Sequence, residues 1–157
     1  MIRIGIVGTS SISERLADAV RAVDGVELGR VASRDAGRGR EFAERIGAPD
    51  IAEGLDALLA EGDVDAVYLA SPNSVHAAQV RAAVDAGIPV LVEKPATLTA
   101  GEWDALVARA RERRVVLLEA MRTAYDPGIR VVQDLLPRVG RPRRVSFRYE
   151  KRSPRYD

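Results

Sequence analysis

The amino-acid sequence predicts an α/β protein whose main domain is a doubly wound parallel sheet. Apolar runs alternate with segments of helical periodicity along most of the chain, which is the pattern of successive β-α-β units. A glycine-containing turn follows the first apolar run, as in many folds of this class. Near the end of the chain the pattern changes to strict alternation of apolar and polar residues. We therefore expect the beginning of a second, α+β domain there, with an open antiparallel sheet.

Apolar runs are predicted to form the strands of one parallel sheet. Each run is nearly continuous rather than alternating, as expected for strands that helices cover on both faces. Right-handed crossovers between the strands favour the order 3-2-1-4-5-6. The runs are residues 2–8, 26–33, 64–70, 88–93 and 115–120.

Helical segments are predicted between these runs. Apolar residues at helical spacing mark the first two, and a short helix is expected at residues 55–59 before the third run. The second helix is expected to end near Gly47 and Pro49. The inward positions are Ile12, Leu16, Ala19, Val20 and Val23 in the first helix, and Phe42 and Ile46 in the second.

Two later helices carry start signals. Asn73 is expected to cap one of them. Thr99 and Glu102 have the spacing of a capping box for the other. The inward positions are Val80 and Val84 in the first of these helices, and Trp103, Leu106 and Val107 in the second.

Composition limits the classes of function. The chain has 157 residues and a formal net charge of +1, so nothing in its charge indicates a nucleic-acid or membrane partner. It has no cysteine and a single histidine, so we expect no metal site. No apolar run approaches the roughly 18 residues of a membrane span. The first strand pattern follows Met1 directly, without a signal peptide, and we expect a cytoplasmic protein.

The end of the chain has a different character, and we place a domain boundary between residues 1–122 and 123–157. Asp126 and Pro127 form a cap-plus-first-turn signal for a helix whose apolar face holds Ile129, Val132 and Leu136. Residues 143–150 then alternate, with Val145, Phe147 and Tyr149 on one side of a predicted strand. No partner strand follows, so we expect a truncated second domain.

The turn after the first strand is a candidate phosphate site. In "GIVGTSSIS", the usual pattern of three glycines becomes Gly8, Ser10 and Ser13. The amino end of a helix offers unpaired N–H groups and partial positive charge, which suit a diphosphate. Gly8 permits the tight turn, and the Ser10 hydroxyl can donate to a phosphate oxygen. The alternative is an ordinary strand-turn-helix connection with good caps.

The end of the second strand indicates which dinucleotide binds. Enzymes that use NAD usually place an acidic residue there for the ribose 2′-hydroxyl. This chain has Ser33 and Arg34, with Arg38 one turn later, and arginine pairs well with a 2′-phosphate. NADP is therefore favoured over NAD. Asp35 can still serve NAD or start the next helix, and both arginines can be plain surface charges.

The segment from Tyr68 to Thr99 carries a specific pair of motifs. One strand ends in "SPN" with His76 three residues after Asn73, and the next ends in "EKP". This arrangement resembles the Gfo/Idh/MocA family of oxidoreductases, that of glucose-fructose oxidoreductase and inositol dehydrogenase. The resemblance extends to Tyr149 and includes "VASRD" and the segment that begins "EAMRTAYDPG".

The resemblance implies roles for matching residues. Lys94 is the expected catalytic residue, beside the nicotinamide and the reacting carbon, and Pro95 is often cis in relatives. His76 is expected to support the cofactor side, and Lys94 and Arg122 to contact the substrate, with Arg122 at a strand end. The residues expected to bind the cofactor are Gly8, Thr9, Ser10, Ser11, Ile12, Ser33, Arg34, Arg38, Ala70, Ser71, Pro72, Asn73, His76, Glu93 and Lys94.

Two functions follow as hypotheses. The first is an NAD(P)-dependent oxidoreductase that moves a hydride between nicotinamide and a sugar-like or polyol-like carbinol carbon, with most of the catalytic C-terminal domain absent. Relatives imply a homo-oligomer. The alternative is a non-catalytic nucleotide-binding module that self-associates through Val145, Phe147 and Tyr149. Lys94 favours the first hypothesis, and the missing second domain favours the alternative.

Overall fold

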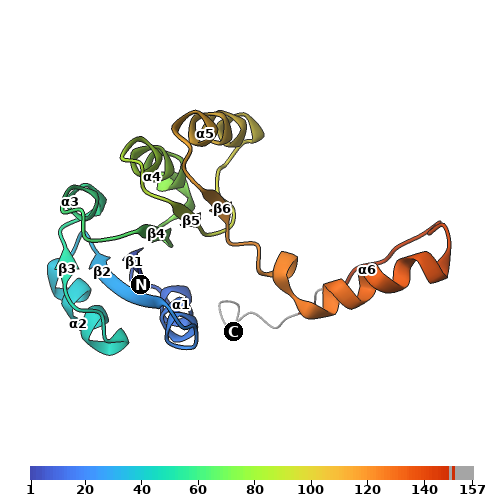
Figure 1. Ribbon diagram of the computed structural model, residues 1–157, viewed down its shortest axis with the longest axis horizontal. Helices are drawn as coiled ribbons and strands as arrows, with labels where there is room; N and C mark the ends of the chain where they lie inside the picture. Colours follow the sequence, from blue (N-terminus) through green and yellow to red (C-terminus); the bar gives the residue numbers. More distant parts are fainter. Residues whose placement is uncertain (149, 151–157) are drawn as a thin grey trace. The chain divides into compact units, whose positions relative to one another are not determined.

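The computed structural model describes residues 1–148 and 150, shown in Figure 1. The chain divides into two compact units, Met1–Met121 and Arg122–Asp157. The first unit holds the whole sheet and the helices packed on it. In the part of the chain that the structure describes, no helix is long and apolar enough to cross a membrane.

The first unit is built on one parallel sheet of six strands in the order β3-β2-β1-β4-β5-β6. This confirms the predicted doubly wound sheet and its order. The third strand is not among the predicted runs, because two residues, Ile51 and Ala52, are too few to show periodicity. The strands are β1 (Ile2–Val7), β2 (Val26–Ala32), β3 (Ile51–Ala52), β4 (Ala66–Leu69), β5 (Val90–Val92) and β6 (Leu117–Glu119).

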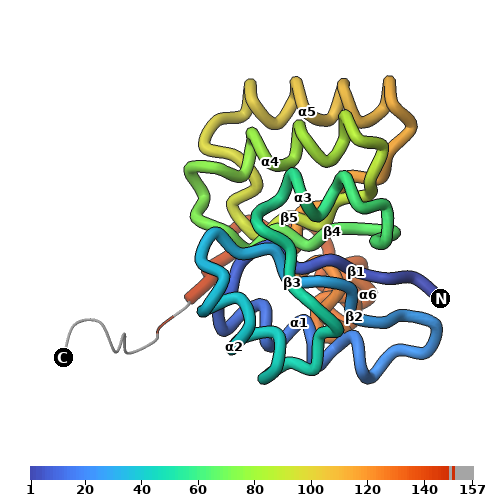
Figure 2. The backbone as a smooth tube through the Cα atoms, turned by 90° about the vertical axis from the view of Figure 1, so that its left-hand side faces the viewer, coloured from blue at the N-terminus to red at the C-terminus, as the bar shows by residue number. Residues whose placement is uncertain are grey.

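Helices cover both faces of the sheet (Figures 1 and 2). One face carries α1 (Ser11–Arg21) and α2 (Ala36–Ile46), which with the sheet bury a cluster including Phe42 and Tyr68. The other carries α3 (Leu55–Ala60), α4 (Asn73–Asp85) and α5 (Ala100–Arg113), over a cluster including Leu58, Leu69 and Leu106. Burial on both sides explains the continuous apolar runs.

Helix boundaries follow the predicted signals in two places. The Thr99 hydroxyl accepts from the Glu102 N–H at 3.2 Å, and Glu102 Oε2 accepts from the Thr99 N–H at 3.1 Å, so the capping box forms as predicted. Gly47 ends α2 with a φ of 64°, where glycine fits best.

Two helix predictions are wrong. Asn73 is the first residue of α4 and Pro72 takes the cap position, because the fixed φ of proline suits the extended cap conformation. Helix α1 ends at Arg21, and the turn through Gly25 takes the chain into β2. Val23 therefore lies outside the helix and is 54% exposed, and Ala19 is exposed rather than inward.

The second unit contains a 3-10 helix, η1 (Arg122–Tyr125), and α6 (Pro127–Val139). Asp126 caps α6 by accepting from the Gly128 N–H at 2.7 Å, as predicted from the Asp-Pro pair. The predicted strand does not form in residues 143–148 or at residue 150, since no described strand pairs with this segment. Tyr149 lies outside the described residues.

Candidate functional site

A hollow of about 470 Å³ opens at the carboxyl ends of the strands. It lies between β1 and β4, where the order of the strands in the sheet reverses direction. Ligands of doubly wound sheets usually bind at this point. Its lining comes from the ends of β1 and β2, the turns after β1, β2 and β4, and residues of α2, α3 and α4. The lining residues are Val7, Gly8, Thr9, Ser10, Ala32, Ser33, Arg34, Arg38, Gly54, Leu55, Ala70, Ser71, Pro72, Val75 and Gln79.

Gly8 is required by the geometry of the first turn. Its φ is +107°, and a Cβ at this position would lie 2.7 Å from the Ala70 carbonyl oxygen. The turns after β1 and β4 therefore lie against each other at Gly8, with no room for a side chain between them. The same bare backbone faces the hollow at the amino end of α1, where unpaired N–H groups favour a phosphate.

Ser10 and Ser13, which stand in place of two of the usual glycines, have different roles. Ser13 is fully buried, and its hydroxyl donates to the Gly8 carbonyl at 2.9 Å, so it holds the turn against the helix. Ser10 is the cap residue of α1 and lines the hollow. Its hydroxyl makes no capping bond and lies 3.4 Å from the Ser13 hydroxyl. Of these two serines, only Ser10 lines the hollow.

The turn after β2 gives the hollow a positive end. Arg34 and Arg38 are exposed and line the hollow, and neither pairs with a carboxylate of residues 1–148 or 150. Asp35 caps α2 by accepting from the Arg38 N–H at 2.9 Å. Ser33 is 8% exposed, and its hydroxyl donates to the Asp35 carbonyl at 2.8 Å, which fixes this turn.

Lys94 follows β5 and is exposed, and its peptide bond to Pro95 is cis. Its N–H donates to Glu93 Oε2 at 3.2 Å, and Glu93 Oε1 accepts from the Tyr68 hydroxyl at 2.7 Å. Burial and the neighbouring Glu93 carboxylate both raise the pKa of Tyr68, so this phenol remains a donor at neutral pH. The core residue Tyr68 therefore holds the Glu93 carboxylate in place next to Lys94.

The predicted site residues fall into two groups. Nine of them line the hollow: Gly8, Thr9, Ser10, Ser33, Arg34, Arg38, Ala70, Ser71 and Pro72. The structure does not place Ser11, Ile12, Asn73, His76, Glu93 or Lys94 on its lining, and Arg122 belongs to the second unit. His76 is fully buried on α4, with its ring nitrogens 2.9 Å from the carbonyl oxygens of Ser71 and Pro95.

Sequence reasoning missed part of the lining and misplaced one residue. Gly54 and Leu55 line the hollow because the unpredicted strand β3 delivers them there, and Gln79 accepts a hydrogen bond from the Ser71 hydroxyl. Arg122 is not at a strand end. The Met121 N–H bonds to the Glu119 carbonyl at 2.7 Å, which turns the chain out of β6, and Arg122 begins η1.

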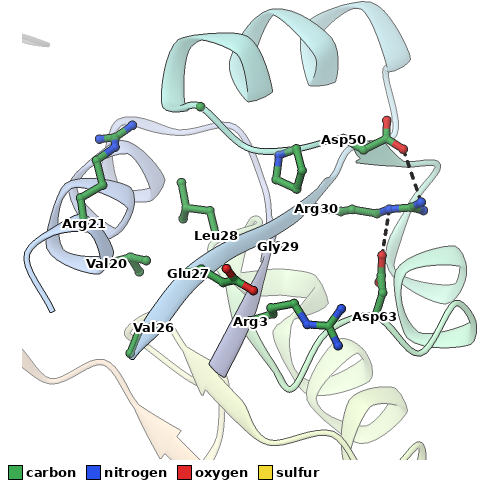
Figure 3. A pocket seen from close by; sticks show the side chains of 12 residues that line it. Arg3, Val20, Arg21, Val26, Glu27, Leu28, Gly29, Arg30, Asp50 and Asp63 are labelled. Atoms are coloured by element: carbon green, nitrogen blue, oxygen red, sulfur yellow. Dashed lines mark ion pairs between the residues drawn. The ribbon is translucent and has the colours of Figure 1, made fainter. Parts of the chain in front are cut away.

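A larger cavity, of about 680 Å³, lies along the amino-terminal halves of β1 and β2 (Figure 3). Its arginines already have partners. Arg30 pairs with Asp50, Glu61 and Asp63, Arg3 with Asp65, and Arg21 with Asp18. With these charges neutralised and no helix start nearby, the cavity is a poor site for a phosphate ligand.

Together, the doubly wound sheet, the Gly8 turn and the hollow at the strand crossover define a dinucleotide-binding domain. A family model described as "Oxidoreductase family, NAD-binding Rossmann fold" matches residues 2–121. The chain belongs to this family, Gfo/Idh/MocA, as its motifs indicated.

Relatives of known sequence and structure share this domain. The chain is 36% identical to the uncharacterized oxidoreductase YgjR of Escherichia coli over 99% of its length, and 35% identical to scyllo-inositol 2-dehydrogenase (NADP(+)) IolU of Bacillus subtilis over 100%. It spans 48% of each. It also matches KijD10, a 3-ketoreductase from Actinomadura kijaniata in complex with TDP-benzene and NADP, with a TM-score of 0.81 and 38% identity. That match covers 87% of this chain and 43% of KijD10.

Proposed function

We propose that this chain is the NADP-binding half of an oxidoreductase that acts on a sugar-like or polyol-like alcohol or ketone. The observation that carries the proposal is the hollow itself, which combines the bare Gly8 turn with two arginines at one end. Relatives named for inositol, xylose and dTDP-sugar substrates support the substrate class. The cytoplasmic location and the homo-oligomer remain predictions.

The lining residues fit a dinucleotide with a 2′-phosphate. Gly8 has no side chain to keep a diphosphate from the amino end of α1, and Ser10 offers a hydroxyl there. At the other end, Arg34 and Arg38 supply the charge that a 2′-phosphate needs. Asp35, the residue that would serve NAD, uses its carboxylate to cap α2. NADP is therefore the preferred cofactor.

Lys94 is the proposed catalytic residue. When bound, the nicotinamide supplies or accepts the hydride. The Lys94 ammonium would donate a hydrogen bond to the substrate oxygen and stabilise negative charge that develops on it. Glu93, bonded to the Tyr68 hydroxyl and to the Lys94 N–H, would hold the backbone of this strand end in place. Arg122 is proposed to bind substrate hydroxyl or anionic groups.

Calorimetric titration of the chain with NADP and, separately, NAD at one salt concentration tests the proposal. We expect NADP to bind at least tenfold more tightly, which corresponds to about 1.4 kcal/mol. Equal affinities would remove the proposed role of the arginines. Binding of neither nucleotide would overturn the assignment of the hollow.

The second candidate is a nucleotide-binding module that self-associates without catalysis. The observation that favours it is the exposure of Val145 and Phe147, which are 62% and 91% exposed. Sedimentation velocity of the chain and of Phe147→Ser tests this candidate. A dimer that dissociates in the variant would show that this face mediates self-association, and a monomer in both would reject the candidate.

A further inference from the structure

The peptide unit that joins Pro95 to Ala96 is held at both of its polar groups. The Pro95 carbonyl oxygen lies 2.9 Å from His76 Nδ1, and the Ala96 N–H donates to Glu119 Oε1 at 2.9 Å. His76 belongs to α4 and Glu119 to β6, so residues of two elements contact the same peptide unit. This peptide follows Lys94 and Pro95 directly. Contacts that fix this peptide unit therefore also fix the backbone that carries the Lys94 side chain.

The second nitrogen of His76 determines the protonation state of the ring. Nε2 lies 2.9 Å from the Ser71 carbonyl oxygen. A carbonyl oxygen can only accept, and both ring nitrogens lie within hydrogen-bond distance of one, so both contacts are hydrogen bonds only if each nitrogen carries a hydrogen. A neutral imidazole has a single N–H and would set a lone pair against a carbonyl oxygen. An imidazolium is thus the form of the ring that satisfies both contacts.

A buried imidazolium needs a compensating charge, because His76 has no exposed surface. Glu119 supplies one through the peptide. Its carboxylate accepts from the Ala96 N–H, which polarises the peptide and makes the Pro95 carbonyl a stronger acceptor for the His76 ring. Cation, peptide and anion thus form one hydrogen-bonded chain across the ends of α4 and β6.

We propose that His76, held as an imidazolium, and Glu119 are a pair of positioning residues that fix the Lys94 segment to the turn after β4. The proposal rests on the proposed function in its assignment of Lys94. Through Ser71, the same ring joins the segment after β5 to the lining of the hollow. Cofactor-binding and catalytic segments are thereby kept in one arrangement before any ligand binds.

The single histidine of the chain makes a direct test possible. We would label the full chain with ¹⁵N and record long-range ¹H–¹⁵N correlations of the His76 ring at pH 7 without nucleotide. An imidazolium gives two nitrogens with closely similar shifts, each bearing a proton protected from solvent. Two widely separated nitrogen shifts, one of them from a nitrogen without hydrogen, would overturn the proposal.

The variant Glu119→Gln tests the role of the carboxylate. Glutamine keeps an oxygen that can accept from the Ala96 N–H but removes the charge, so we expect the neutral ring to become the main form. The control Glu44→Gln removes an exposed carboxylate from α2, on the other face of the sheet, and should leave the ring spectrum unchanged. An unchanged ring spectrum in Glu119→Gln would refute the coupling through the peptide.

The positioning effect is measured by hydrogen exchange at the Ala96 N–H. In His76→Gln we expect this amide to exchange at least tenfold faster than in the wild type, whereas amides in the centre of β1 should not change. Equal exchange rates at Ala96 would contradict the positioning role. None of these measurements uses nucleotide, so the failure of NADP to bind would reject the proposed function without affecting them.

Discussion

The hydroxyl of Tyr68 donates a 2.7 Å hydrogen bond to the carboxylate of Glu93, the residue before Lys94. Tyr68 is 2% exposed and belongs to the core cluster under α1 and α2. The bond therefore runs from the core to the strand end that carries the proposed catalytic residue. It links the stability of the sheet to the arrangement of the site.

Replacing Tyr68 with phenylalanine should destabilise the chain. The ring still fills its place in the core, but the Glu93 oxygen loses a donor. A hydrogen bond to a charged group contributes about 1.5–3 kcal/mol, and water can partly replace it at half-buried Glu93, so we expect a loss of about 1–2 kcal/mol. Urea unfolding at pH 7 measures it. Tyr125→Phe is the control, because Tyr125 is 63% exposed, and it should change little.

The same residue predicts how stability changes at high pH. Burial and Glu93 raise the pKa of Tyr68 above the ordinary value of 10.0, so above that pH the folded chain holds a proton that the unfolded chain loses. This contribution is complete below pH 10 and is lost as the pH rises above it. From pH 9 to 11 the free energy of unfolding should fall more steeply in wild type than in Tyr68→Phe. Parallel curves would contradict this.

Gly8→Ala should impair both folding and nucleotide binding. The new Cβ would lie 2.7 Å from the Ala70 carbonyl oxygen, at a φ of +107° that only glycine adopts readily. We expect a loss of stability of more than about 2 kcal/mol, from backbone strain together with the contact. NADP affinity should fall at least tenfold, as measured by calorimetry on the folded fraction.

Gly25→Ala is the matched control for that variant. Gly25 has a φ of +80° but nothing within 4 Å of its added Cβ, so an alanine there causes backbone strain without a steric contact. A loss of about 1–2 kcal/mol with unchanged NADP affinity is expected. If both alanine variants bind NADP as the wild type does, the turn at Gly8 does not receive the phosphates.

Thr99→Ala removes one half of the capping box of α5. The Glu102 N–H loses its acceptor at the helix start, and the reciprocal bond from Glu102 remains. Loss of a capping side chain typically costs about 1 kcal/mol. Thermal and urea unfolding should show that loss for alanine and almost none for Thr99→Ser, which retains the hydroxyl. Equal losses in both variants would mean that the threonine methyl group matters instead.

The architecture of the sheet was accessible from the sequence because burial on both faces leaves continuous apolar runs, and these runs are local. Where a local signal was too short or had no partner, prediction failed. Ile51 and Ala52 form a strand of two residues through pairing with Val31 and Ala32, which periodicity cannot reveal. Residues 143–148 alternate as a strand does, yet alternation does not supply a neighbouring strand.

The site, like the sheet, has one part that local sequence signals predict and one part that they do not. The turns at Gly8, Arg34 and Pro72 were predicted because each directly follows a strand whose carboxyl end faces the crossover. The contacts behind the site were not predicted. His76 is 19 residues from Pro95 in sequence, and Glu119 is 23 residues from Ala96. Only the packing of α4 against β5 and the pairing of β6 with β5 bring those groups to one peptide.

Arg34→Ala provides the sharpest test of cofactor choice. The Arg34 guanidinium is exposed, lines the hollow and has no ion-pair partner among residues 1–148 and 150, so its removal should leave folding intact. A charge-assisted bond to phosphate contributes about 1.5–3 kcal/mol. NADP affinity should therefore fall roughly tenfold or more while NAD affinity stays the same. Arg40→Ala, which removes an exposed arginine of α2 that is not part of the lining, should change neither affinity. Calorimetry with both nucleotides on both variants measures this difference. A parallel loss of NADP and NAD affinity in Arg34→Ala would assign the arginine to the shared part of the dinucleotide rather than to the 2′-phosphate.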